Sequence, residues 1–233
     1  MSDTLIEAQR LSAGYGKMAI VREVDIRVDA GEVVALFGAN GAGKTTTLLA
    51  LAGELTPMEG EVRFLGQPTT APMHVRCRNG LGYVTEERSV IMDMTVADNL
   101  KLADVSPATA CENFPALEPI MKRRAGLCSG GEQQMVALAR VLGRHPKVLL
   151  VDELSLGLAP IIVTNLLQAV RSVAENQGIG VLLVEQHVRQ ALKVADRAYV
   201  MERGHIALNG TADEVVSQLD KIESAYLSSA DGS

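Results

Sequence analysis

Apolar residues near the N-terminus alternate with polar ones, and further along the chain they form short continuous runs. Every second position is apolar in residues 5–11 and 20–28, a pattern typical of antiparallel strands with one buried face. A glycine-containing turn at residues 14–17 lies between these segments. Continuous apolar runs instead predict strands buried on both faces, as in parallel sheets, and they occur at residues 33–37, 148–151 and 181–184.

Helical patterns lie between the apolar runs, at residues 45–52, 132–142 and 161–175. This alternation of strand and helix predicts an α/β core with right-handed crossovers. Towards the C-terminus, residues 197–201 and 205–208 predict a hairpin, and a short helix at residues 211–219 follows it. Residues 228–233 are small and polar, and we expect them to form a flexible tail.

One region departs from this alternation. Residues 89–127 contain no buried strand run, and three prolines divide them into short helical pieces, namely Pro107, Pro115 and Pro119. We interpret the region as a small helical insertion carried on the α/β core.

The composition is that of a globular protein and argues against several classes of function. Of the 233 residues, 47% are hydrophobic and 3% aromatic, so stacking platforms for single-stranded nucleic acid are not expected. The net charge of −6 also argues against a nucleic-acid partner. The cysteines lack metal-ligand spacing, and neither a secretory leader nor an apolar run of about 18–20 residues is found. We therefore expect a cytoplasmic protein.

A phosphate-binding loop is the strongest chemical signal in the sequence. Residues 38–45 match the pattern G-x-x-x-x-G-K-[ST] between a predicted buried strand and a predicted helix. Glycines let backbone N–H groups point at phosphates, Lys44 adds a charge for the β- and γ-phosphates, and Thr45 offers a hydroxyl to Mg²⁺. The residues expected to bind ATP here are Gly38, Ala39, Asn40, Gly41, Ala42, Gly43, Lys44, Thr45 and Thr46.

Two carboxylates follow the second buried run. Asp152 and Glu153 would be costly to bury at a strand end unless a cation met them. Asp152 fits a ligand of Mg²⁺, and Glu153 fits a base that orients the attacking water on the γ-phosphate. Taken alone, such a pair is also compatible with a polar cap on a strand.

A second anion site is predicted at the start of the helix at residues 132–142. Ser129, Gly130 and Gly131 precede it, and a serine with two glycines at a helix N-terminus suits a phosphate. One molecule has little use for two γ-phosphate sites. Two molecules arranged head to tail would use both.

In this order, the motifs resemble those of the ATP-binding subunits of ABC transporters, over about residues 4–227. The narrower resemblance is to the second ATP-binding subunit of branched-chain amino-acid importers. It implies a phosphate-loop NTPase core at about residues 33–88 and 132–219, with an N-terminal antiparallel β subdomain at about 4–32 and a helical insertion at about 89–131. The matching segments are residues 38–47, 94–96, 99–100, 129–135, 155–160, 184–186 and 224–227.

The resemblance also implies roles for single residues. Tyr15 would stack on adenine. The segment that would contact the γ-phosphate of ATP held by the opposite subunit consists of Ser129, Gly130, Gly131 and Glu132. Residues 155–158 would cross the interface between two subunits, and the helical insertion would dock on a membrane-spanning partner.

Some positions depart from the wider family. Glu86 stands where a glutamine usually contacts Mg²⁺. A glutamate at this position is also found in the branched-chain subfamily. After the third buried run, Gln186 stands where a histidine is usual, and His187 comes one step later. Adjacent side chains on a strand point to opposite faces, so we favour Gln186 for the γ-phosphate and keep His187 as the alternative. The insertion is also shorter than in branched-chain relatives, between Leu100 and Phe114.

Together these features predict a Mg²⁺-dependent ATPase subunit of an ABC importer, located at the cytoplasmic face of the membrane. Its partners would be a second ATP-binding subunit, either a copy of itself or a distinct paralogue, and transmembrane permease subunits that provide the only membrane contact. Branched-chain amino acids are the favoured solutes, with urea or short amides as the alternative. A phosphate-loop kinase and a soluble ABC-type ATPase without a transport role are rival readings.

Overall fold

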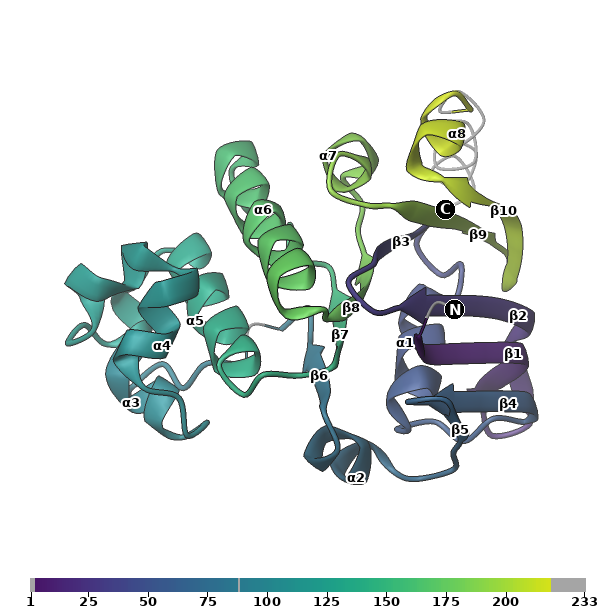
Figure 1. Cartoon of the computed structure of the whole chain (residues 1–233), viewed down its shortest axis with the longest axis horizontal. Helices are drawn as coiled ribbons and strands as arrows, with labels where there is room; N and C mark the ends of the chain where they lie inside the picture. Colours follow the sequence, from purple (N-terminus) through teal and green to yellow (C-terminus); the bar gives the residue numbers. More distant parts are fainter. Residues whose placement is uncertain (1–2, 88, 219–233) are drawn as a thin grey trace.

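The computed structural model describes residues 3–87 and 89–218, which form two sheets and a group of short helices (Figure 1). The first sheet is antiparallel, with the strand order β2-β1-β4-β5. Its strands are β1 (Thr4–Tyr15), β2 (Met18–Asp29), β4 (Glu59–Phe64) and β5 (Gln67–Pro68). The predicted pairing of the two N-terminal strands is confirmed.

The antiparallel sheet extends beyond the N-terminal segment expected to form it, because β4 and β5 also join it. The sequence did not reveal these strands. In β4 only Val62 and Phe64 are buried, and β5 has two residues, both exposed. Strands this short and this exposed carry too few apolar positions to show a period.

Over the described part of the chain, the second sheet has six strands in the order β10-β9-β3-β8-β7-β6, and only the β10–β9 pair is antiparallel. Every residue of β3, β7 and β8 is buried, as their continuous apolar runs predict. β6, with four residues, was not predicted. The strands are β3 (Val33–Gly38), β6 (Leu81–Val84), β7 (Val148–Asp152), β8 (Gly180–Val184), β9 (Arg197–Glu202) and β10 (His205–Thr211).

The longer helices begin and end close to where their patterns predict. They are α1 (Lys44–Ala52), α5 (Gly130–Leu142) and α6 (Pro160–Gln177). Two short helices were not predicted, α2 (Met73–Arg78) and α7 (Val188–Leu192). The C-terminal helix α8 (Ala212–Val216) is shorter than expected. The end of that expected helix, the end of the domain at 227 and the tail at 228–233 lie outside the described residues.

Successive residues of the central strands pack into different cores, as the alternation of a pleated strand requires. Ala35 and Phe37 of β3 join a core with α5 and α6. Val34 and Leu36, which alternate with them, join a core with α1 and the antiparallel sheet. Each fully buried Val, Leu or Phe contributes about 1.5–3 kcal/mol relative to exposure. The strand ends at the carboxyl side of this sheet are therefore rigidly placed.

The segment interpreted as a helical insertion forms short helices, on the left in Figure 1. Its elements are α3 (Val96–Lys101), α4 (Pro107–Asn113) and two 3₁₀ turns, η1 (Pro115–Ile120) and η2 (Ala125–Leu127). Thr95 and Ser106 cap α3 and α4, because their hydroxyls accept hydrogen bonds from backbone amides three residues later. Leu100 and Leu117 are fully buried against the core that contains α5.

Candidate functional site

The phosphate loop connects the end of β3 to the start of α1, as the sequence predicts. Glycine is required at both ends of this loop. A Cβ on Gly38 would lie 2.5 Å from the Met201 carbonyl oxygen, and one on Gly43 would lie 2.5 Å from Val21 Cγ1. Gly43 also has a φ of 108°, in the left-handed region that other residues avoid. The backbone N–H groups at the start of α1 thus follow a tightly packed loop, a geometry suited to anions.

Lys44 is buried above the loop to which it belongs, with 5% of its surface exposed. Its Nζ donates hydrogen bonds to the carbonyl oxygens of Gly38 at 2.9 Å and Ala39 at 3.2 Å. The same atom lies 3.9 Å from Glu153 Oε1. Burial lowers the pKa of Lys44, and the negative charges of Glu153 and Asp152 partly oppose that change. The ammonium group therefore lies between the loop and the end of β7.

Asp152 is the last residue of β7 and is also buried, with 4% exposed. The pKa of its carboxyl is raised to about 6, mainly by burial and partly by the charges of Glu153 and Glu86, while the Thr45 hydrogen bond and the Lys44 charge oppose the rise. Of the predicted Mg²⁺ ligands, Thr45 and Glu86 are thus near enough to Asp152 to change its pKa. Oxygen donors with excess negative charge fit a hard divalent cation.

The residues 3–87 and 89–218 contain no group of three or more His, Cys, Asp or Glu side chains arranged to hold a metal ion. Mg²⁺ is commonly bound through one or two carboxylates together with the phosphates of a substrate. The Thr45–Asp152 pair matches that mode of binding, because the Thr45 hydroxyl hydrogen-bonds the Asp152 carboxylate.

Glu153 has both carboxylate oxygens engaged. Gln186 Nε2 donates a hydrogen bond of 2.9 Å to Oε2, and Lys44 Nζ faces Oε1. The backbone at Glu153 has a φ of 51°, and its amide donates to the Val184 carbonyl at 3.0 Å. A non-glycine residue in this region is costly and is often found at functional sites. The structure thus brings Lys44, Glu153 and Gln186 together.

His187, the alternative to Gln186, lies elsewhere. It is exposed and precedes α7, and its side chain does not cap that helix. The neighbouring Gln186 is the residue whose side chain contacts Glu153.

Tyr15, the predicted adenine contact, is the last residue of β1 and is 53% exposed. It lies at the phosphate-loop end of the antiparallel sheet. Ala13 pairs with Val21, and Val21 packs closely against Gly43. An exposed aromatic ring at this place is available for stacking.

The second predicted anion site is built as a capping box at the start of α5. The Ser129 hydroxyl accepts from the Glu132 amide at 3.3 Å, and the Glu132 carboxylate accepts from the Ser129 amide at 2.6 Å. That amide is the main reason why the pKa of Glu132 is lowered, and Arg123, at 3.1 Å, contributes to it. Ser129 is exposed, Gly130 half-buried and Gly131 buried.

The helix that begins at this second site and the helix that follows the phosphate loop pack into different cores. Helices α5 and α1 lie on opposite sides of strands β6, β7 and β8 (Figure 1). One copy of the chain therefore keeps its two predicted anion sites apart.

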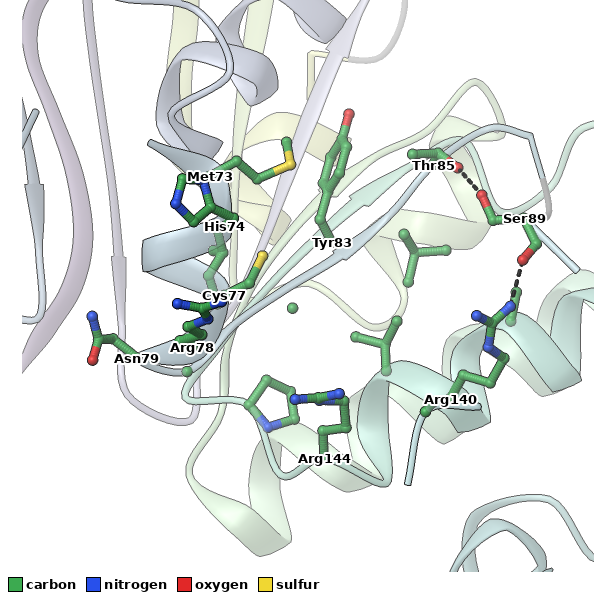
Figure 2. A pocket seen from close by; sticks show the side chains of 18 of the residues that line it. Met73, His74, Cys77, Arg78, Asn79, Tyr83, Thr85, Ser89, Arg140 and Arg144 are labelled. Atoms are coloured by element: carbon green, nitrogen blue, oxygen red, sulfur yellow. Dashed lines mark hydrogen bonds between the residues drawn. The ribbon is translucent and has the colours of Figure 1, made fainter. Parts of the chain in front are cut away.

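A groove of about 1090 Å³ lies between α2, β6 and the end of α5 (Figure 2). Tyr83 extends from β6 into it, and Met73 and Cys77 of α2 form one wall. On the opposite wall, Arg140 donates a hydrogen bond to the carbonyl of Ser89. No sequence pattern predicted this groove, because neither α2 nor β6 is long enough to show a recognisable period.

Sequence reasoning also missed a buried polar pair next to the site. The Ser155 hydroxyl donates a hydrogen bond to the Glu185 carboxylate, and these residues are 3% and 0% exposed. Burial raises the pKa of Glu185 to about 7, and the hydrogen bond from Ser155 partly opposes that rise. A glutamate that directly follows a buried apolar strand was the available signal.

Comparisons with known proteins agree with this geometry. Residues 21–155 match the family model described as ABC transporter. The chain is 39% identical to the high-affinity branched-chain amino acid transport ATP-binding protein BraG of Pseudomonas aeruginosa, over 96% of this chain and 99% of that protein. It is 37% identical to the lipopolysaccharide export system ATP-binding protein LptB of Acidithiobacillus ferridurans, over 91% and 92%. An ATP-binding cassette of an ABC transporter, solved in its ADP conformation, superposes with a TM-score of 0.86 at 25% identity, over 96% of this chain and 98% of that one.

Proposed function

The chain belongs to the ABC transporter family of ATP-binding proteins, and on that basis we propose that it is the ATPase subunit of an importer of branched-chain amino acids. The similarity to BraG over nearly the full length of both proteins carries the choice of solute. The similarity to LptB supports a second candidate, lipopolysaccharide export. An importer of urea or short amides and a soluble ABC-type ATPase are the remaining alternatives.

In the proposed reaction, ATP is the substrate and water attacks its γ-phosphate, the bond to the β-phosphate oxygen breaks, and ADP and phosphate leave. The loop amides and Lys44 bind the phosphates, and Tyr15 holds the adenine. Glu153 orients the water and accepts its proton, while Gln186 fixes the carboxylate through their 2.9 Å hydrogen bond. Thr45, Asp152 and Glu86 would hold Mg²⁺, and the bound ion would neutralise negative charge on the phosphates.

We further propose that two cassettes bind two ATP molecules head to tail. The separation of α1 and α5 within one chain supports this arrangement (Figure 1). Ser129, Gly130 and Gly131 of one cassette would then face the γ-phosphate bound by the other. The second cassette is a copy of this chain or a distinct paralogue.

Replacing Gln186 and His187 in turn separates their roles. We expect Gln186→Ala to lower kcat about tenfold, because Glu153 loses a hydrogen bond to a charged acceptor. His187→Ala is expected to keep kcat within about threefold, since the exposed imidazole is not bonded to Glu153. Steady-state ATPase assays measure both. A larger effect of His187→Ala would reverse the assignment.

Membrane partners would dock at the groove and the helical insertion. In residues 3–87 and 89–218, no helix combines the length and apolarity needed to cross a bilayer. The groove is lined by more basic than acidic side chains, in contrast to the net charge of −6 for the whole chain. We therefore propose that the permease segment seated in the groove is acidic. The basic lining residues are Arg78, Arg140, Arg144 and Lys147, and the acidic ones are Glu54 and Glu87.

Reversing one charge in the groove tests this docking. Arg144→Glu is expected to weaken binding to washed membrane vesicles of the source organism about tenfold, by repelling an acidic segment. Its affinity for ATP should stay unchanged, because α1 and the phosphate loop do not line the groove. Arg10→Glu, at an exposed position of β1, is the matched control and should bind the vesicles normally. Equal binding by both variants would remove the groove from the proposal.

The solute is tested on the complex isolated from source membranes through a tag on this chain. Reconstituted into proteoliposomes, the complex is expected to accumulate labelled leucine, isoleucine and valine when ATP is present. A Glu153→Gln complex is the control and should accumulate none. ATP-dependent uptake of urea would instead support the urea or amide importer, and ATP-dependent release of lipopolysaccharide would support the exporter. A complex without any membrane-embedded partner would support a soluble ABC-type ATPase.

A further inference from the structure

The ends of β7 and β8 are joined by side chains as well as by their backbones. The two strands are parallel neighbours whose last paired residues are Asp152 and Val184. Beyond that pair, Gln186 donates to Glu153, and Ser155 donates to Glu185. The segment that follows β7 is thus tied at two points to the segment that follows β8.

The Ser155–Glu185 bond is the buried one of these two ties. Glu185 is 0% and Ser155 3% exposed, whereas Gln186 is exposed. A hydrogen bond to a carboxylate in a buried site is stronger than one in water. The Glu185 carboxylate also accepts from the backbone amides of Leu154 and Gln186, which hold it in place to receive the Ser155 hydroxyl. This tie should therefore resist displacement more than the exposed one.

Directly after Ser155, the chain turns outward. Leu156 is 47% exposed, Gly157 has a φ of 69°, and the Leu158 amide donates to the Ser155 carbonyl at 3.1 Å. The turn at residues 155–158 thus has one buried, side-chain-anchored end and an exposed apolar tip. The position of Ser155 determines where Leu156 projects.

We propose that Glu185 is a positioning residue, which through Ser155 fixes the turn at residues 155–158 so that Leu156 meets a second cassette. The inference rests on the proposed function, because it requires two cassettes to associate. Glu185 also adjoins Gln186, which holds Glu153. Contact with the second cassette and the placement of Glu153 are therefore set by consecutive residues of one rigid segment.

The test uses ATP-dependent dimerisation of the full chain carrying Glu153→Gln, followed by light scattering. Ser155→Ala, which removes the donor, and Glu185→Met, which removes the acceptor, are each expected to weaken the dimer about tenfold. Glu185→Gln keeps an acceptor, and since burial raises the pKa of Glu185 to about 7, it should dimerise like the parent. The double variant with Ser155→Ala and Glu185→Met should be no weaker than Glu185→Met alone, because Glu185→Met already removes the bond to Ser155 together with those from the Leu154 and Gln186 amides.

The affinity of the monomer for ATP separates positioning from a general structural role. This affinity should change less than about twofold in every variant. When Ser155→Ala and Glu185→Met are each made in the protein that retains Glu153, kcat should fall about tenfold while KM for ATP is unchanged. A Ser155→Ala protein that dimerises as tightly as its parent would overturn the inference, as would a Glu185→Gln protein as weak as Glu185→Met. Ser155→Ala removes a single oxygen, so it decides the matter even where Glu185→Met does not fold. A parent that stays monomeric with ATP would instead contradict the proposed composite site, and the role of the turn with it.

Discussion

Glu153→Gln is expected to retain ATP binding and to lose at least about 100-fold in kcat, because general-base assistance typically contributes 10²–10⁴-fold. An amide has the shape of the carboxylate and still accepts the Gln186 hydrogen bond, but it does not take a proton from water. The loop contacts of Lys44 with Gly38 and Ala39 do not involve Glu153 and should persist. Steady-state hydrolysis and equilibrium binding of ATP measure the two effects separately.

Glu175→Gln is the matched control, since it makes the same chemical change on the exposed surface of α6. It should hydrolyse ATP at the normal rate. Near-normal hydrolysis by Glu153→Gln would contradict the assignment of the base.

The same variant reports on the head-to-tail pair when its mass is followed by light scattering. An ATP-dependent species near twice the monomer mass, with two bound nucleotides, would support composite sites formed by copies of this chain. A monomer that binds one ATP tightly would indicate that a distinct paralogue supplies the second cassette. A monomer that binds none would contradict the interpretation of the phosphate loop.

The elements that could be predicted from the sequence are the continuous apolar strands and the longer amphipathic helices, together with the motifs formed by consecutive residues. β3, β7 and β8 are buried on both faces, and their apolar runs have no competing interpretation. β4, β5, β6 and α2 were missed because each has six residues or fewer, and β4 and β6 are held by pairing with strands distant in the sequence. Tertiary contacts, rather than local preference, decide such elements.

The same division holds for the site. The phosphate loop at residues 38–45 and the Asp152–Glu153 pair each consist of consecutive residues, so both could be predicted from a local motif. The choice between Gln186 and His187 depends on how the chain turns after β8, which no pattern in one sequence specifies. The Ser155–Glu185 bond joins residues 30 positions apart, and the pairing of β7 with β8 is what brings them together.

Lys44→Ala is expected to weaken ATP binding about 100-fold or more, which is the largest loss we expect at the nucleotide site. The ammonium lies 3.9 Å from Glu153 Oε1, and its charge also opposes the rise in the pKa of Asp152. Without it, the γ-phosphate would approach two carboxylates with no positive side chain between them, and a charge-assisted contact worth roughly 1.5–3 kcal/mol is lost as well.

Folding should be affected much less than binding by this change. Lys44 is 5% exposed and burial lowers its pKa, so holding it charged in the folded protein already costs free energy. We therefore expect the Tm of Lys44→Ala without nucleotide to lie within a few degrees of the unsubstituted protein. Lys101→Ala, on the exposed side of α3, is the control for charge and should bind ATP normally. Calorimetric titration with ATP, with thermal unfolding in parallel, measures both quantities. A large drop in Tm with unchanged ATP affinity would make Lys44 a structural residue, and the proposed binding of the γ-phosphate would then have to rest on the loop amides alone.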